Sequence, residues 1–178
     1  MIERDLENLD VPALDLVFMR LPGGPLVDSG VPLEESMEYL AKLQADGVIK
    51  HIGLRSASAE QIERAKAIIP VDAAQNACFV GGGQTMDVIH LCTAEKIPFF
   101  AYFPLGMGTL IQKKIDLEPL ASTHRASKTQ VALAWLLALS PMMVPIPGTS
   151  KLEHLRENMA AINLRLSPDE VELLSNVA

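Results

Sequence analysis

A glycine-led turn followed by a helical segment near the C-terminus is the part of the sequence best suited to chemistry. Gly148, Thr149 and Ser150 follow a short apolar run and precede residues with helical periodicity. Because the first N–H groups of a helix have no partner inside the helix, such starts bind phosphate. Ser150 and Glu153 have the spacing of a capping box, which predicts that a helix begins at Ser150. The pattern indicates a phosphate site, although an ordinary capped strand-to-helix turn has the same pattern.

The helix predicted after this turn carries polar side chains at helical spacing. His154, Glu157 and Asn158 are three and four residues apart, so they share one face of the helix. That face either lines a bound nucleotide or is a polar face in contact with solvent.

Other side chains that suit a nucleotide stand at the ends of predicted strands. In a βα barrel the loops after the strands gather at one face, so residues there could line one ligand site. These residues are Arg20, Arg55, Ser56, Gln75, Tyr102 and Phe103. Two arginines, an aromatic pair and an amide suit an anionic ligand that contains rings, such as a dinucleotide. Alternatively, Tyr102 and Phe103 are core aromatics and Arg55 is a solvated surface cation.

The elements that would position these residues alternate between strand and helix. Apolar runs of strand length are followed by helix-periodic segments, which predicts a parallel α/β architecture. The predicted strands cover residues 14–19, 48–54, 71–75, 97–102 and 142–146. The predicted helices cover residues 33–45 and about 85–95, and four more begin at Ser58, Ser127, Ser150 and Ser167.

Composition predicts one globular domain over residues 1–178. The 178 residues are 49% hydrophobic, which is enough for a single substantial core, and no linker divides the chain. A formal net charge of −7 argues against nucleic acid as a partner. No apolar run is long enough to span a membrane and no signal peptide is recognisable, so we expect a cytoplasmic protein with no membrane partner.

The cysteines and histidines do not form a metal-ligand pattern. Cys78 and Cys92 are interpreted as small buried side chains in a reducing compartment, in preference to a redox pair. None of the four histidines stands at ligand spacing from these cysteines. We therefore expect no metal site.

The run from Pro145 to Asn158 is similar to the cofactor loop and following helix of the aldo-keto reductases, in which the loop holds the 2′-phosphate and adenosine of NADP. The resemblance implies that Gly148, Thr149 and Ser150 hold the phosphate and that His154, Glu157 and Asn158 line the adenosine side. His154 stands where many members have arginine. A neutral imidazole lacks the planar charge that arginine offers a phosphate.

The same resemblance assigns the nicotinamide end of the cofactor. Gln75 matches a glutamine that binds the carboxamide, and Tyr102 matches the aromatic residue on which the nicotinamide ring stacks. The run that begins Tyr102-Phe103 resembles the family's aromatic-Ser-Pro-Leu-Gly turn, with phenylalanine in place of serine. Arg55 and Ser56 occupy the place of a Ser-Asn pair that usually also holds the carboxamide.

The fold implied by the resemblance is part of a (β/α)8 TIM barrel. Five βα units cannot close an eight-stranded barrel, which usually needs about 250 residues. The chain resembles only the latter part of the family barrel, from the helix before the fourth strand onward, plus a C-terminal helix. We therefore expect either a fragment or an assembly that covers the open sheet edges at residues 14–19 and 142–146.

Arg20 is the candidate catalytic residue. The family reduces carbonyls by hydride transfer from NADPH, with a tyrosine, a lysine and an aspartate that have no counterpart in this chain, and a histidine that polarises the carbonyl. Residues 14–20 match the strand that normally ends in that histidine. Arginine cannot shuttle a proton near neutral pH but can polarise a carbonyl oxygen. The alternative is an arginine paired with a carboxylate such as Asp15 or Asp28.

Three interpretations remain open at this stage. The first is an NADP-dependent oxidoreductase for small aldehydes or ketones that is inactive as the isolated chain. Members that resemble pyridoxal reductases also carry the arginine and a Phe-Pro-Leu-Gly turn, which makes a B6 vitamer one candidate substrate. The second is a non-catalytic NADP-binding or assembly module completed by a second copy, as a homo-oligomer, or by a complementing fragment. The third is a gene model from which the upstream barrel has been left out.

Overall fold

The computed structural model describes residues 2–21, 31–82, 85–108 and 115–177. The chain divides into two compact units, Met1–Gln75 and Asn76–Ala178. Five strands follow chain order in the sheet, β1-β2-β3-β4-β5, and helices lie between them in sequence. The α/β class expected from the sequence is confirmed. The single domain expected over residues 1–178 stays a prediction.

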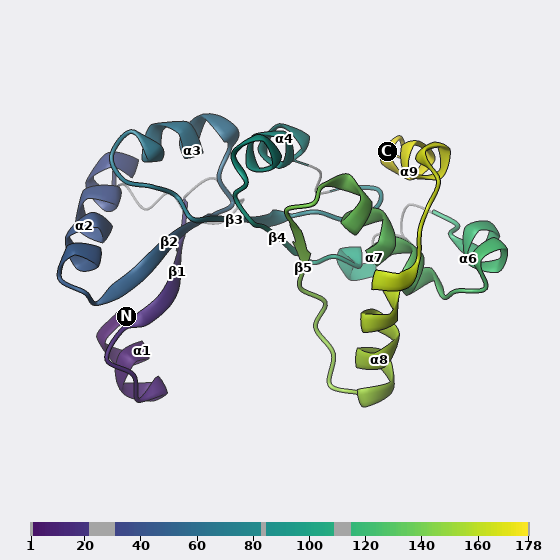
Figure 1. Ribbon diagram of the computed structural model, residues 1–178, viewed down its shortest axis with the longest axis horizontal. Helices are drawn as coiled ribbons and strands as arrows, with labels where there is room; N and C mark the ends of the chain where they lie inside the picture. The colour runs from purple at the N-terminus through teal and green to yellow at the C-terminus, as the bar shows by residue number, and fades with distance from the viewer. Residues whose placement is uncertain (1, 22–30, 83–84, 109–114, 178) are drawn as a thin grey trace. The chain divides into compact units, whose positions relative to one another are not determined.

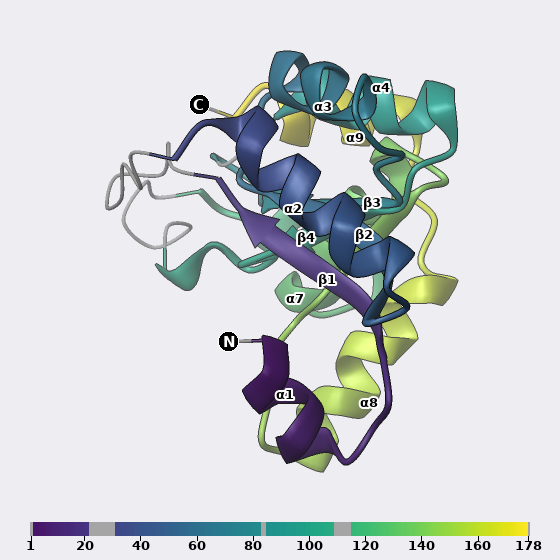
Figure 2. The ribbon, with the colours of Figure 1, turned by 90° about the vertical axis from the view of Figure 1, so that its left-hand side faces the viewer.

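The first unit is built from three parallel strands and three helices (Figure 1). Its elements are α1 (Ile2–Leu9), β1 (Leu14–Arg20), α2 (Leu33–Ala45), β2 (Ile49–Arg55), α3 (Ala59–Lys66) and the first residues of β3 (Ala73–Ala77). β1 pairs with β2, and β2 pairs with β3, both in parallel. Figure 2 shows α2 alongside β2, where Met37 and Leu40 are buried. The core of this unit therefore lies between the sheet and its helices.

Local sequence signals set the helix ends of this unit. Gly47 adopts a φ of +75° directly after α2, a conformation that costs glycine little. The Ser58 hydroxyl accepts the Gln61 N–H at 3.2 Å, and the Gln61 side chain accepts the Ser58 N–H at 2.9 Å. The helix start predicted at Ser58 is confirmed. β1 is mostly half-buried because it is the first strand of the sheet and lacks a neighbour on one side among the described strands.

The second unit is helix-rich (Figure 1). Its elements are α4 (Met86–Glu95), β4 (Phe99–Tyr102), η1 (Gly106–Gly108), α6 (Glu118–His124), α7 (Lys128–Leu139), β5 (Met143–Pro145), α8 (Leu152–Ala160), η2 (Ala161–Asn163) and α9 (Pro168–Ser175). β4 and β5 pair in parallel, with Phe99 opposite Met143. Among the described residues, no helix is long and apolar enough to cross a membrane.

Helix α7 is the centre of this unit, since it contacts β5, α6, α8, α9 and η2. Six consecutive residues, from Val131 to Leu136, are buried, so the helix is apolar on every side. The Trp135 indole N–H donates to the Ser175 hydroxyl at 3.0 Å, which satisfies the polar atom of a fully buried ring. Ser127 and Gln130 form a capping box at the start of α7, where the sequence predicted that a helix begins.

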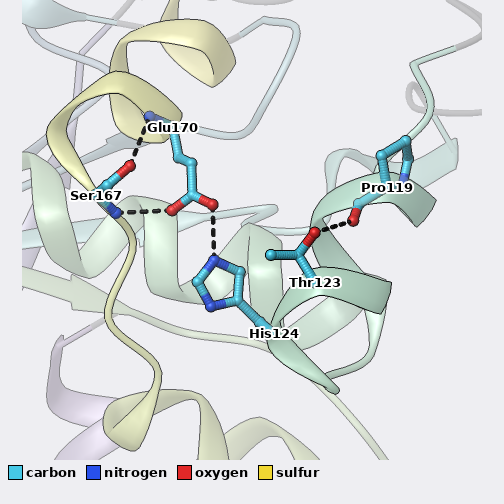
Figure 3. Close-up of polar contacts among 5 residues, drawn as sticks. All are labelled: Pro119, Thr123, His124, Ser167 and Glu170. Carbon is cyan, nitrogen blue, oxygen red and sulfur yellow. Dashed lines mark hydrogen bonds and ion pairs between the residues drawn. The ribbon is translucent and has the colours of Figure 1, made fainter.

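A polar cluster joins α6 to α9 in the second unit (Figure 3). One Glu170 carboxylate oxygen accepts the Ser167 N–H at 2.7 Å, and the other lies 2.8 Å from His124 Nε2. The Glu170 N–H donates to the Ser167 hydroxyl at 3.3 Å, which completes the capping box of α9. The Ser167 backbone bond, together with the bond to His124, holds the pKa of Glu170 below its ordinary value. Within α6, the Thr123 hydroxyl donates to the Pro119 carbonyl.

We expect Glu170→Gln to lower the melting temperature at pH 7 by about 2–4 °C, because a charged acceptor worth about 1 kcal/mol is lost while the cap acceptor remains. A carboxyl with a lowered folded pKa stabilises the fold above its unfolded pKa, and this contribution is lost as the pH falls through the folded pKa. The difference from wild type should therefore shrink in acid. Thermal melts across pH 3 to 7 measure it, with the exposed Glu172→Gln as control. An equal difference at every pH would contradict the role assigned to the charge.

Candidate cofactor site

The strand ends of the first unit bring three predicted site residues into one row. Arg20 lies opposite Arg55 in the β1–β2 register, and Arg55 lies opposite Gln75 in the β2–β3 register. Because side chains alternate between the two faces of a strand, residues aligned across neighbouring strands project to the same face. Arg20 is exposed, whereas Arg55 and Gln75 are half-buried. The row offers two cationic groups and one amide.

Ser56 ties the ends of β2 and β3 together. Its backbone adopts a φ of +59°, in the left-handed region, and its N–H donates to the Gln75 carbonyl at 2.9 Å. This conformation is uncommon for a residue other than glycine and turns the chain sharply after Arg55. The Arg55-Ser56 pair and Gln75 are thus held side by side by the backbone.

A cleft of about 410 Å³ lies beside Arg20 within the first unit. Its lining includes Arg20, Ser36, Gln61 and Arg64. Arg64 was not selected from the sequence because its position beside Arg20 depends on the packing of α3 against α2. Glu34 of α2 holds it, with 2.6 Å between Arg64 Nη2 and Glu34 Oε1.

The pairing of Arg20 with a carboxylate was the alternative interpretation of this residue. Asp15 is instead paired with Lys50, with 2.6 Å between Lys50 Nζ and Asp15 Oδ1. Asp28 lies outside the described residues. The structure therefore assigns Asp15 a partner other than Arg20.

The second unit places Tyr102 and Phe103 in contact at the end of β4. Their rings meet edge to face, with centroids 5.0 Å apart and planes at 84°. Phe103 is 47% exposed, so the alternative of a core aromatic is wrong for this residue, while Tyr102 is half-buried. Phe103 has a φ of +53°, and its carbonyl accepts the Gly106 N–H at 2.8 Å. A bulky side chain in left-handed backbone is an outlier of the kind found at binding sites.

The turn after β5 differs from its prediction in two respects. Helix α8 begins at Leu152, its N-cap residue is Lys151, and no side chain caps it, so the predicted Ser150–Glu153 capping box is wrong. The Thr149 hydroxyl instead accepts the Lys151 N–H at 3.2 Å, a local bond that leaves Lys151 in extended backbone. Gly148 does not have a positive φ, so the turn does not depend on glycine for its backbone angles.

The corner formed by Gly148, Thr149, Ser150 and the start of α8 fits an anion better as a result. No side chain caps the helix, so the backbone N–H groups of Leu152, Glu153 and His154 remain available as hydrogen-bond donors at the positive end of the helix. Gly148, Thr149 and Ser150 are exposed, and a Cβ added at Gly148 would meet nothing within 4 Å. The donor set and the open space suit a phosphate group that approaches the backbone closely. We call these residues the phosphate corner.

The polar residues on α8 differ in their surroundings. His154 is exposed, while Glu157 and Asn158 are half-buried. The Glu157 carbonyl accepts the Gln130 side-chain amide at 3.4 Å, which links α8 to α7. Asn158 borders an apolar groove beside Leu155 and Met159. His154 is therefore the member of this trio that is most accessible to a ligand at the phosphate corner.

The cysteines behave as buried apolar side chains. Burial raises the pKa of Cys78 to about 12 and that of Cys92 to about 11, so neither thiol is activated. Within the described part of the chain, no group of three or more histidine, cysteine, aspartate or glutamate residues could hold a metal ion.

Comparison with known proteins identifies the family. The model of the aldo/keto reductase family matches residues 1–178. The chain belongs to the aldo/keto reductase family. It is 36% identical over 181 residues to pyridoxine 4-dehydrogenase of Escherichia coli (strain K12), a match that covers 99% of this chain and 62% of that protein.

Solved structures of aldo-keto reductases share the fold. A thermostable aldo-keto reductase solved with the inhibitor epalrestat is 30% identical, has a TM-score of 0.85, and is matched over 99% of this chain and 64% of its own. A Klebsiella pneumoniae enzyme solved with NADP and acetate is 24% identical, with a TM-score of 0.80 over 99% and 62% of the two chains. This chain therefore spans less than two thirds of the length of these relatives. Its fold corresponds to part of a (β/α)8 barrel, as predicted.

The structure brings the predicted residues together in three groups. Arg20, Arg55, Ser56 and Gln75 form one group in the first unit. In the second unit, Tyr102 and Phe103 form another, and the phosphate corner with α8 forms the third. We predict that these three groups of residues bind one cofactor, and this convergence stays a prediction for the chain.

Proposed function

We propose that this chain is part of an NADP-dependent oxidoreductase that reduces small aldehydes or ketones in the cytoplasm. The observation that carries the proposal is the uncapped start of α8 beside exposed Gly148, Thr149 and Ser150. Family membership supports it, and so does the NADP held by the Klebsiella pneumoniae structure of the same fold.

The cofactor residues follow from the three groups. The phosphate corner would hold the 2′-phosphate, and the adenosine would be lined by His154, Glu157 and Asn158. The nicotinamide would be flanked by Tyr102 and Phe103, and its carboxamide would be held by Arg55, Ser56 and Gln75. Each assignment uses a chemical match. Backbone N–H groups suit phosphate, an aromatic face suits a flat ring, and an amide pairs with an amide.

Arg20 is the residue of this chain that would act on the substrate. When bound, the nicotinamide supplies the hydride. Arg20 is exposed at the end of β1, where its guanidinium can donate hydrogen bonds to a carbonyl oxygen and stabilise the negative charge that develops there. It cannot deliver a proton near neutral pH, so a completed site needs a separate acid. We therefore expect no turnover from the isolated chain.

The substrate class proposed is a small aromatic aldehyde of the B6 type. The Escherichia coli relative is named pyridoxine 4-dehydrogenase. Arg20 at the strand end and the Phe103-Pro104-Leu105-Gly106 turn are the features of this chain on which the proposal rests. An NADPH oxidation assay on pyridoxal and on simple aldehydes tests it, with the chain joined to the barrel strands of a relative that this sequence does not match.

His154→Arg is expected to strengthen NADPH binding by about fivefold, since a planar guanidinium next to the phosphate corner would add a charge-assisted bond. NADH lacks the 2′-phosphate, so its affinity should stay within roughly twofold of the wild-type value. Titration of cofactor fluorescence measures both. A gain of equal size for NADH and NADPH would mean that residue 154 lies away from the 2′-phosphate.

The second candidate function is a non-catalytic NADP-binding or assembly module that completes a barrel with a partner. The favouring observation is the exposed apolar surface of α8 and of the residue that follows β5. Leu155 and Met159 of α8 are 48% and 63% exposed, and Ile146 is 41% exposed. Surfaces of this kind mark contacts with another chain. The partner would be either a second copy, as a homo-oligomer, or a complementing fragment.

A further inference from the structure

The cleft beside Arg20 is lined by polar side chains that can all donate hydrogen bonds. It has a volume of about 410 Å³, and residues of β1, α2 and α3 contribute to it. Its polar side chains are those of Arg20, Ser36, Gln61 and Arg64, and no carboxylate is among the described residues that line it. A cleft of this size is large enough for a small organic molecule.

Several of these donors are not used by the fold. Within the described residues, the Arg20 guanidinium makes no ion pair and no hydrogen bond, and the Ser36 hydroxyl has no partner there either. The Gln61 side-chain oxygen accepts the Ser58 N–H at 2.9 Å, which leaves the Gln61 NH₂ group able to donate. The cleft therefore offers charged and neutral donors to a ligand.

Glu34 fixes the position of Arg64 at this cleft. Arg64 Nε and Nη2 lie 3.0 and 2.6 Å from the same carboxylate oxygen, Glu34 Oε1. These hydrogen bonds hold the pKa of Glu34 below its ordinary value, so Glu34 is charged at neutral pH and balances the charge of Arg64. Arg20 adds a positive charge that no described carboxylate balances. The polar lining together with Glu34 thus has a net positive charge.

This donor set matches an oxyanion better than a neutral group. Guanidinium groups bind phosphate and carboxylate through charge-assisted hydrogen bonds, and the planar arrangement of their N–H groups fits two oxygens at once. A hydroxyl and an amide add neutral donors to the same oxygens. A neutral molecule in the cleft would gain nothing from the two charged side chains.

Arg20 connects the cleft to the candidate site at the strand ends. It lines the cleft, and it also lies opposite Arg55 in the row that continues to Gln75. A molecule with an oxyanion against Arg64 can therefore present its other end beside Arg20. That end is where the proposed reaction requires a carbonyl oxygen.

We propose that the cleft binds the phosphate or carboxylate of a small anionic aldehyde, and that Arg64 selects such substrates over neutral ones. The inference rests on the proposed oxidoreductase function, because that function makes the ligand an aldehyde. Among aldehydes of the B6 type, one that carries a phosphate monoester should bind better than pyridoxal, which has no such group.

The test is the amide spectrum of the isotope-labelled chain during addition of phenyl phosphate, benzoate or benzyl alcohol, which share a ring and differ in charge. The two anions should shift the signals of Ser36, Gln61 and Arg64, and benzyl alcohol should not. Phenyl phosphate should bind at least about threefold more tightly than benzoate, because its oxyanion carries more charge. The order of the two anions identifies phosphate or carboxylate as the preferred group.

Arg64→Gln should weaken the binding of phenyl phosphate by about tenfold, since a charge-assisted contact is lost. Arg4→Gln is the matched control, because Arg4 is an exposed arginine of α1 in the same unit and lies outside the cleft. It should change the affinity by less than roughly twofold. Ser36→Ala removes no hydrogen bond between described residues and should weaken binding by about threefold. Circular dichroism checks that the variants fold.

Three results would overturn the proposal. They are unchanged signals at Ser36, Gln61 and Arg64, equal shifts with benzyl alcohol, and an affinity that neither Arg64→Gln nor Ser36→Ala lowers more than Arg4→Gln does. Shifts confined to the start of α8 belong to the first result and would place the anion at the phosphate corner. Anion binding at the cleft of a chain that binds no NADPH would leave the cleft assigned and contradict the oxidoreductase proposal, so the two failures are distinguishable.

Discussion

Ser150→Asp is expected to weaken NADPH binding by about tenfold or more while NADH binding changes by less than roughly twofold. A carboxylate at this exposed position of the phosphate corner would face the 2′-phosphate, and like charges a few ångströms apart repel by more than the 1.4 kcal/mol that corresponds to tenfold in affinity. NADH carries no phosphate at that place. Parallel titrations of the two cofactors, followed by nucleotide fluorescence, measure the difference.

The control for this experiment is Asn163→Asp, which adds the same charge at an exposed position of η2 in the same unit. It should leave both affinities unchanged within roughly twofold, because the salt-screened interaction falls off beyond about 8–10 Å. If Ser150→Asp weakened NADH as much as NADPH, the corner would hold a different part of the nucleotide. If neither affinity changed, the cofactor would bind elsewhere.

In a chain joined to the barrel strands of a relative that this sequence does not match, Arg20→Ala is expected to reduce kcat/KM for pyridoxal by about 100-fold. The loss of one preorganised donor to a developing oxyanion has an effect of about 10²–10³. Arg20→Lys should recover part of the rate, because it keeps the charge but lacks the planar fork of donors. Steady-state NADPH oxidation at saturating cofactor measures the effect.

A role in catalysis predicts a particular division of that effect. The fall should appear in kcat as well as in kcat/KM, since the donor acts on the charge that forms during the reaction. The affinity for NADPH, measured separately, should stay unchanged. If only the KM for the aldehyde changed, Arg20 would bind the substrate without a role in the chemical step. If neither kcat nor KM changed, Arg20 would be a surface residue with no part in the reaction.

The helix starts predicted from capping residues were correct where no neighbouring side chain competes for the same backbone N–H groups. Ser58, Ser127 and Ser167 were each expected to begin a helix, and all three form capping boxes with the residue three positions later. Ser150 has the same spacing and does not cap. There the neighbouring Thr149 hydroxyl accepts the Lys151 N–H, and the N-cap is Lys151, one residue later than predicted. Because Thr149 and Ser150 are neighbours, a hydroxyl bond to the backbone could form from either residue, and it forms from Thr149.

Helix α6 was not predicted from the sequence. Its N-cap residue is Leu117, and no side chain caps it. The alignment of Arg20, Arg55 and Gln75 could be anticipated from strand ends alone, because parallel neighbours share one direction. The position of Arg64 beside Arg20 could not, since it depends on how α3 packs against α2.

The most direct measurement of the central claim is the amide spectrum of isotope-labelled chain during addition of NADPH. The N–H signals of Leu152, Glu153 and His154 should shift together, with an affinity in the micromolar range, because these donors would bind the 2′-phosphate. NADH should shift them far less. Unchanged signals at these three residues, with shifts elsewhere or none at all, would contradict the assignment of the phosphate corner.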